Sequence, residues 1–161
     1  MRVEIIAVGR IKSSAEKDLF DRFLERFNGL GRGQGLGPLS LTEIEEKRPL
    51  PRKELALREG EKILAALPRE TRLIALDERG KALESAQFAK KLKDWRDEGV
   101  QNTTFVIGGA GGLSDAIRAR ADLIISFGQQ TWPHMLTRAM LAEQLYRAAT
   151  ILAGHPYHRE G

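Results

Sequence analysis

The sequence predicts an α/β protein with a mostly parallel β-sheet and helices on both of its faces. Segments with strand-like patterns alternate along the chain with segments whose apolar residues recur at helical spacing. Such alternation is typical of parallel strands joined by crossover helices. At 161 residues and 42% hydrophobic content, the chain suits one domain, residues 1–161, and no internal repeat or linker divides it.

Each element has its own local signal. Apolar residues at helical spacing, often after a capping serine, predict helices over residues 14–27, 52–67, 85–98, 114–121 and 135–153. In the helix over residues 85–98, Phe88, Leu92 and Trp95 are expected to face the core. Short alternating or apolar runs predict strands over residues 2–8, 39–44, 71–76, 103–107 and 123–126.

Two glycine-rich segments differ in position. Residues 29–37 match neither a dinucleotide-binding fingerprint nor a P-loop, and we expect a flexible loop there with no regular element. Residues 108–112 follow a buried strand and precede a helix, where open α/β sheets bind ligands. A tight turn without a ligand is the alternative. If the strands ending at Leu76, Gly108 and Ser126 are neighbours, their ends frame one pocket.

Composition excludes several classes of site. The chain has no cysteine, which rules out disulfides, thiolate zinc sites and iron–sulfur clusters. No metal site is expected, because His155 and His158 provide only two of the three or four ligands that zinc requires. No segment is apolar enough for a membrane span, and residues 1–8 do not resemble a signal peptide, so we expect a cytoplasmic protein. The net charge of +4 favours a polyanionic partner only weakly.

The three histidines all lie near the C-terminus. Thr131 is predicted to cap the last helix, with Pro133 in its first turn. His134 and Arg138 are four residues apart and therefore share a helix face. Glu143 and Arg147 have the same spacing and are expected to form a stabilising ion pair.

Several motifs occur together in a fixed order. They are Leu76-Asp77-x-x-Gly80-Lys81, Phe105-Val106-Ile107-Gly108-Gly109-x-x-Gly112, Thr131-x-Pro133-His134-x-x-x-Arg138, Glu143-Gln144-Leu145-Tyr146-Arg147-Ala148 and Pro156-Tyr157-His158. The chain thereby closely resembles, over its whole length, the ribosomal RNA large-subunit methyltransferase H family of the SPOUT superfamily. Its segment 29–37 is richer in glycine than the resemblance leads us to expect.

The resemblance implies a C-terminal trefoil knot, a homodimer with cofactor pockets near the subunit interface, and S-adenosylmethionine as cofactor. It implies methylation at N3 of pseudouridine 1915 in 23S rRNA on the assembled 70S ribosome. General topological rules would exclude a knot. The cofactor contacts that it implies are Leu76, Gly108, Gly109, Gly128, Gln129, Gln130, Thr131, Trp132 and Pro133.

The chemistry suggests a catalytic set. Methyl and nucleophile must be held in line, and the N3 imide must lose a proton to a base or to a stabilised anion. We expect catalysis and substrate holding from His134, Arg138, Tyr157, His158 and Arg159. In this hypothesis His158 is a candidate base, and Arg138 or Arg159 binds a phosphate or a base oxygen.

Other interpretations stay open at this point. The basic segment 47–53 either contacts rRNA phosphates or is simply solvated. The chain could also be an RNA- or ribosome-binding module without catalysis, or a related SPOUT enzyme that acts on tRNA. Binding of S-adenosylmethionine would distinguish an enzyme from a non-catalytic module. Methylation of rRNA or of tRNA would distinguish the proposed family from a related tRNA enzyme.

Overall fold

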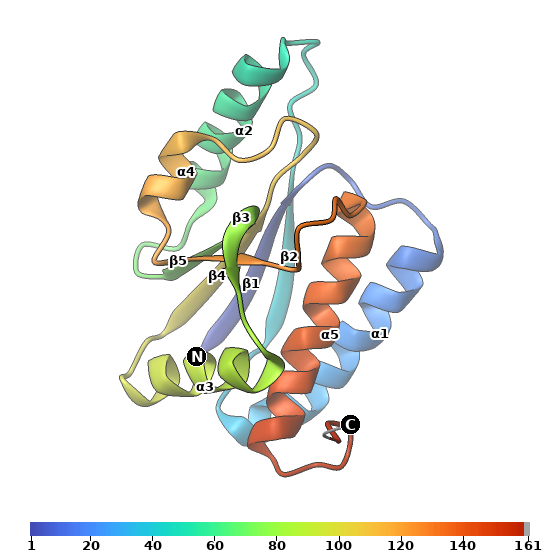
Figure 1. Ribbon diagram of the computed structural model, residues 1–161, viewed down its shortest axis with the longest axis vertical. Coiled ribbons are helices and arrows are strands. Elements are labelled where there is room, and N and C mark those ends of the chain that lie inside the picture. Colours follow the sequence, from blue (N-terminus) through green and yellow to red (C-terminus); the bar gives the residue numbers. More distant parts are fainter. Residues whose placement is uncertain (160–161) are drawn as a thin grey trace.

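In the computed structural model, which describes residues 1–159, five parallel strands form one sheet in the order β2-β1-β4-β3-β5 (Figure 1). The strands are β1 (Arg2–Val8), β2 (Leu39–Ile44), β3 (Arg72–Ala82), β4 (Asn102–Ile107) and β5 (Leu123–Ser126). The helices are α1 (Ala15–Gly31), α2 (Arg52–Ala66), α3 (Ser85–Asp97), α4 (Asp115–Arg120) and α5 (His134–Leu152), with a 3₁₀ turn η1 at Arg32–Gln34. The predicted α/β class is confirmed.

Helices cover both faces of the sheet (Figure 1). Ile5 and Phe105 point to one face and join a core with residues of α1, α3 and α5, including the predicted Phe88, Leu92 and Trp95. Ile6 and Val106 point to the other face and pack with Ile63 of α2 and Ile117 of α4. Successive residues of one strand therefore enter two separate cores, as the side-chain alternation of a strand requires.

The carboxyl ends of β4, β3 and β5 are adjacent, because β3 pairs with β4 on one side and with β5 on the other. The assumption behind the predicted pocket is therefore correct. However, β3 does not end at Leu76 as predicted. Leu76 and Lys81 both pair with Ile125, so residues 77–80 form an irregularity and the strand resumes beyond it. At Gly80 an added Cβ would lie 2.5 Å from the carbonyl carbon of Ile125, so only glycine fits there.

The prediction of an irregular loop over residues 29–37 is wrong for residues 29–34 and correct for residues 35–37. Helix α1 continues to Gly31, the turn η1 follows, and the Leu36 amide donates to the Gly31 carbonyl at 2.9 Å. Phe27 and Leu36 are both buried in the core. Their burial outweighs the weak helix propensity of the intervening glycines, because tertiary packing contributes most of the stability of a protein helix.

Helix α5 also begins differently from the prediction. Its N-cap residue is Pro133, and no side chain caps it, so Thr131 does not serve as the cap. Within the part of the chain that the structure describes, no helix is both long and apolar enough to cross a bilayer.

Candidate active site

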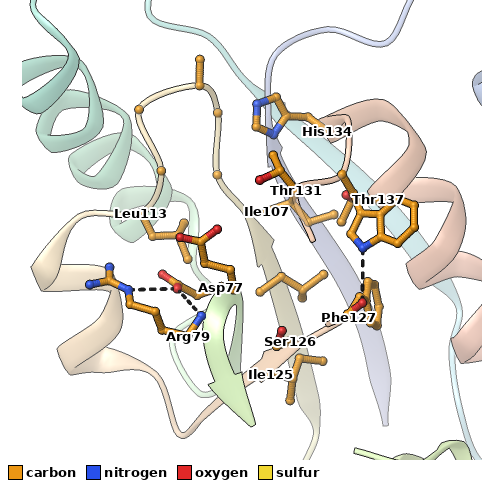
Figure 2. Close-up of a pocket in the computed structure, with 18 of the residues that line it drawn as sticks. Asp77, Arg79, Ile107, Leu113, Ile125, Ser126, Phe127, Thr131, His134 and Thr137 are labelled. Carbon is orange, nitrogen blue, oxygen red and sulfur yellow. Dashed lines mark hydrogen bonds and ion pairs between the residues drawn. The ribbon is translucent and has the colours of Figure 1, made fainter. Parts of the chain in front are cut away.

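A cavity of about 580 Å³ opens where β3, β4 and β5 end (Figure 2). Its volume falls within the range of roughly 300–1,000 Å³ that is usual for small-molecule sites. Leu76, Gly108 and Ser126 all line it, so the three strand ends do frame one pocket. Apolar lining comes mainly from Ile107, Leu113, Ile125, Phe127 and Trp132.

The loop at residues 108–112 forms one wall through its backbone. A Cβ on Gly108 would lie 3.0 Å from the Gly112 carbonyl carbon, and one on Gly111 would lie 2.9 Å from the Arg52 carbonyl oxygen. Gly112 has φ +78°, a conformation that favours glycine. Gly109 and Gly112 form an isolated antiparallel bridge, whereas the amides of Ala110 and Gly111 form no hydrogen bond within residues 1–159. The segment is therefore a tight turn, and the binding of a ligand to it stays a prediction.

The connection from β5 to α5 forms the opposite wall. The Ser126 hydroxyl donates to the Gly128 carbonyl at 2.8 Å and accepts from its amide at 3.1 Å. The Trp132 indole donates to the carbonyl of Phe127 at 3.2 Å, and a dashed line marks this bond in Figure 2. Seven of the nine predicted cofactor contacts line the cavity, namely Leu76, Gly108, Gly109, Gly128, Gln130, Thr131 and Trp132. Gln129 and Pro133 belong to the same connection but do not line it.

Asp77 organises the irregular part of β3 beside the cavity. Its carboxylate accepts from the Arg79 amide at 2.9 Å and from the Arg118 guanidinium at 2.8 Å. Burial alone would raise the pKa of Asp77, but the hydrogen bonds from Arg79 and Arg118 outweigh it and lower that pKa. The carboxylate stays charged and occupied, which makes it a structural anchor for Arg118.

The first turn of α5 places His134 and Thr137 at the cavity (Figure 2). His134 is exposed, as a residue that meets a substrate must be. Among the residues that line the cavity, the sequence did not predict Arg52, Asp77, Arg118 or Thr137. Arg52 opens α2, which is distant in sequence from the other walls, so no local pattern could have identified it.

Arg138 does not reach the cavity or solvent. It is 0% exposed, and its guanidinium donates to Glu43 at 2.8 Å and to the carbonyls of Val8 and Gly9 at 2.8 and 2.6 Å. The expectation that Arg138 binds phosphate or a base oxygen is therefore wrong, because these partners and its burial leave no access for RNA. Arg138 instead ties the first turns of α5 to the ends of β1 and β2.

The C-terminal tail docks on the other end of α5. The predicted pair forms, with Arg147 donating to Glu143 at 2.6 Å, and the Tyr157 hydroxyl donates to the same carboxylate at 3.0 Å. Arg147 also lies over the Tyr157 ring, 4.8 Å from its centroid, and 3.3 Å from Nδ1 of His158. Burial and the bond to Glu143 raise the pKa of Tyr157, so its phenol remains protonated and donates.

The predicted catalytic residues therefore do not gather within one chain. At 1.5 Å per residue, Glu143 and Arg147 lie roughly 14 and 20 Å along α5 from His134. Figure 1 shows the tail at the end of α5 that is opposite the β5–α5 connection. Arg159 is exposed, and its guanidinium donates to the Pro156 carbonyl at 3.3 Å. Residues 160–161 of the predicted tail lie outside the described residues.

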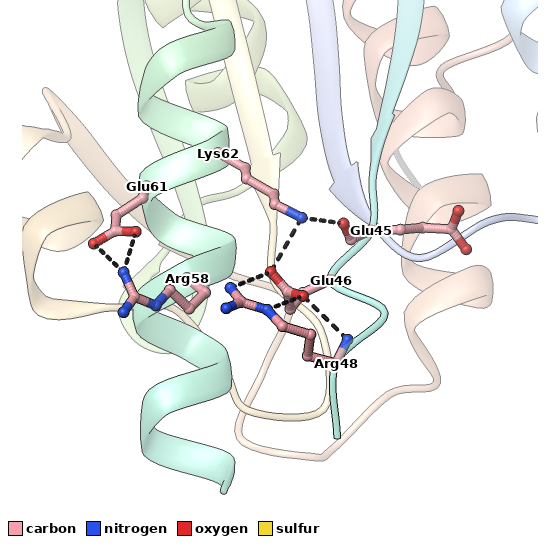
Figure 3. Close-up of polar contacts among 6 residues, drawn as sticks. All are labelled: Glu45, Glu46, Arg48, Arg58, Glu61 and Lys62. Carbon is pink, nitrogen blue, oxygen red and sulfur yellow. Dashed lines mark hydrogen bonds and ion pairs between the residues drawn. The ribbon is translucent and has the colours of Figure 1, made fainter. Parts of the chain in front are cut away.

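The basic segment 47–53 is partly neutralised (Figure 3). Glu46 accepts from Arg48 at 2.9 Å and pairs with Lys62 at 3.1 Å, and these bonds lower the pKa of Glu46. Lys62 also donates to the Glu45 carbonyl, which pins the β2–α2 connection to α2. Arg48 is thus engaged internally. Over residues 1–159, no group of three or more His, Asp or Glu side chains is arranged to hold a metal ion.

Comparison with known proteins adds the family. Residues 1–158 match the family model described as "Predicted SPOUT methyltransferase". The chain is 52% identical over 159 residues to a ribosomal RNA large subunit methyltransferase H of Paramagnetospirillum magneticum and 54% identical to one of Bradyrhizobium diazoefficiens, with 99% of each chain covered.

Among solved structures, a probable methylase family protein from Haemophilus influenzae Rd KW20 has a similar fold. The TM-score is 0.52 at 11% identity, over 98% of this chain and 70% of that one. Such low identity supports the fold alone, whereas the matches near half identity extend over the full length of the chain. The chain belongs to the ribosomal RNA large subunit methyltransferase H family of SPOUT methyltransferases.

Proposed function

We propose that this protein transfers a methyl group from S-adenosylmethionine to N3 of pseudouridine 1915 in 23S rRNA, on the assembled ribosome. The observation that carries the proposal is the cavity at the ends of β3, β4 and β5, with its apolar side chains and its closely packed glycine loop. Apolar side chains suit a purine ring, and polar groups such as those of Ser126, Gln130 and Thr131 suit the polar atoms of a nucleoside or amino acid. The choice of large-subunit ribosomal RNA as substrate follows from the names of the relatives.

The proposed cofactor residues are the seven predicted contacts that line the cavity, while Gln129 and Pro133 would support their loop. When bound, S-adenosylmethionine supplies an activated methyl group on a sulfonium. The protein's own task is to orient the target base and to take the N3 proton. Tyr157 is protonated and donates to Glu143, so it does not serve as the base. His158 remains the proposed base, and Arg159 the proposed phosphate contact.

The distance between His134 and the tail supports action as a homodimer. Within one chain, His134 lies far from Tyr157 and His158. In a dimer, the tail of the second chain can reach the cavity of the first chain. An apolar hollow among α1, α5 and the start of α3, lined by Leu19, Phe88 and Met140 among others, offers a surface for such pairing. The trefoil knot, the 70S context and the cytoplasmic location stay predictions that follow from the family.

The deciding experiment is mass mapping of rRNA nucleosides after incubation with labelled S-adenosylmethionine. Ribosomes, free 23S rRNA and tRNA are assayed in parallel. We expect label only in the ribosome sample, on pseudouridine 1915 of its 23S rRNA. Label in tRNA would show that the substrate is tRNA and not 23S rRNA. Calorimetry that detects no binding of S-adenosylmethionine would leave only a non-catalytic module.

Two variants test the shared site. We expect His134→Ala and His158→Ala to be inactive alone and partly active when co-expressed with different tags, because the mixed dimer holds one intact site. If the mixture stays inactive, each tail serves its own chain. An unchanged rate and pH profile for His158→Ala would remove His158 from the mechanism.

A further inference from the structure

Glu59 of α2 is a buried carboxyl group for which the proposed reaction has no use. Glu59 is 5% exposed, and its Oε2 atom has no hydrogen-bond partner. A buried acceptor without a partner costs stability, and such groups are rare in folded proteins. The position of Glu59 therefore calls for a function.

That carboxyl group lies against the glycine loop of the cavity. A Cβ on Gly109 would lie 3.3 Å from Oε2 of Glu59 and 2.7 Å from Cγ1 of Val8. Gly111 packs on the same helix, with its Cβ position 2.9 Å from the Arg52 carbonyl and 3.3 Å from Cβ of Ala56. The loop is thus seated on the face of α2 that carries Glu59.

The loop also has donors without acceptors. The amides of Ala110 and Gly111 form no hydrogen bond within residues 1–159. An unpaired buried acceptor and neighbouring unpaired donors are complementary in hydrogen bonding. Glycine at position 109 leaves the space through which the carboxyl group and the backbone can approach.

We propose that Glu59 is a positioning residue whose carboxyl group accepts amide hydrogens of Ala110 and Gly111 when the loop closes on the cofactor, and so sets the shape of the wall that holds it. The inference rests on the proposed cofactor. Glu59 does not line the cavity, so it acts through the loop and not by contact with the ligand.

The charges around Glu59 predict how pH acts on this step. Burial raises the pKa of Glu59, the Glu46 carboxylate raises it further, and the Lys62 ammonium opposes them. Amides that donate to the carboxylate stabilise its charged form, so closure of the loop lowers this pKa again. Cofactor binding therefore releases a proton, and affinity weakens as the pH falls through the raised pKa.

The test measures S-adenosylmethionine binding by calorimetry for the full-length protein and two variants. In Glu59→Leu a similar volume remains without an acceptor, and we expect affinity about tenfold weaker, the size of one lost hydrogen bond to a charged group. Its resistance to denaturant should not fall, because an unpaired buried charge has been removed. Glu59→Gln keeps an acceptor oxygen and should bind nearly as the wild type does at neutral pH.

A matched control is Glu61→Gln, which changes an exposed carboxylate on the same helix and should leave binding unaltered. Equal affinities for the wild type and Glu59→Leu would overturn the proposal. If Glu59→Leu fails to fold, the pH series decides. The proposal is supported if the affinity of the wild type decreases as the pH is lowered while the affinity of Glu59→Gln stays constant. It is overturned if the two affinities depend on pH in the same way. A wild type that binds no cofactor would refute the proposed function itself.

Discussion

Residues 29–37 and 108–112 are both rich in glycine, and the structure uses them differently. In the first segment Gly29 and Gly33 have open space where a Cβ would project, and the chain completes a helix and a 3₁₀ turn. In the second, Gly108, Gly109 and Gly111 all lie in close contact with other atoms, at the ends of adjacent strands. Glycine content alone therefore does not identify a ligand loop. The two segments differ in place, because residues 108–112 line the cavity and residues 29–37 do not.

The largest effect is expected for Gly109→Ala. The new Cβ would collide with Val8 and approach Glu59, so the loop must move. Overpacking of this kind costs about 1–3 kcal/mol, and we expect S-adenosylmethionine affinity to fall by about tenfold to a hundredfold. Calorimetry measures it, with Gly33→Ala as the matched control. Wild-type affinity in Gly109→Ala would remove the distinction between the two segments.

Gly31→Ala should distort residues 29–37 and leave residues 108–112 unchanged. Its Cβ would lie 2.8 Å from the Leu36 carbonyl oxygen, at the point where the chain turns back to the core. We expect a loss of about 1–3 kcal/mol in the free energy of unfolding. Urea denaturation measures the loss, and cofactor affinity of the folded protein should not change. Weakened binding at unaltered stability would connect this segment to the site.

Gly112→Ala sharpens the comparison through backbone strain. Gly112 has φ +78° with open space around its Cβ position, so strain is the only cost. We expect a loss of about 1–2 kcal/mol in unfolding free energy. Gly35→Ala, at φ +67°, provides the counterpart in the first segment. Both variants should be destabilised in denaturation, and only Gly112→Ala should weaken cofactor binding. Equal binding by both would contradict the assignment.

Gly29→Ala is expected to have the smallest effect, and a favourable one. The residue is exposed within α1, and nothing lies within 4 Å of its Cβ position. Replacement of a helical glycine by alanine gains about 0.5–1 kcal/mol. Thermal denaturation should show a raised midpoint with no change in methyl transfer. A lowered midpoint would mean that α1 does not extend to this residue in solution.

Particular residues show how far the sequence could predict the structure. Phe88, Leu92 and Trp95 were placed in the core by their spacing, because helical periodicity is a local property. Leu76, Gly108 and Ser126 were placed at one pocket because parallel strands share an edge. Arg138 was assigned to the substrate from its place beside His134 on a helix face. Nothing local indicated that Glu43 would meet it in the interior.

The sequence by itself determined the succession of strands and helices, the α/β class, the family, and the glycine loop at the end of β4. Those features depend on spacing between near neighbours and on motifs of a few residues. Only the tertiary structure decided that Arg138 is buried, that the tail lies away from the cavity of its own chain, and that Glu59 faces Gly109. Such contacts join segments far apart in sequence, and the packing of the whole sheet with its helices sets them.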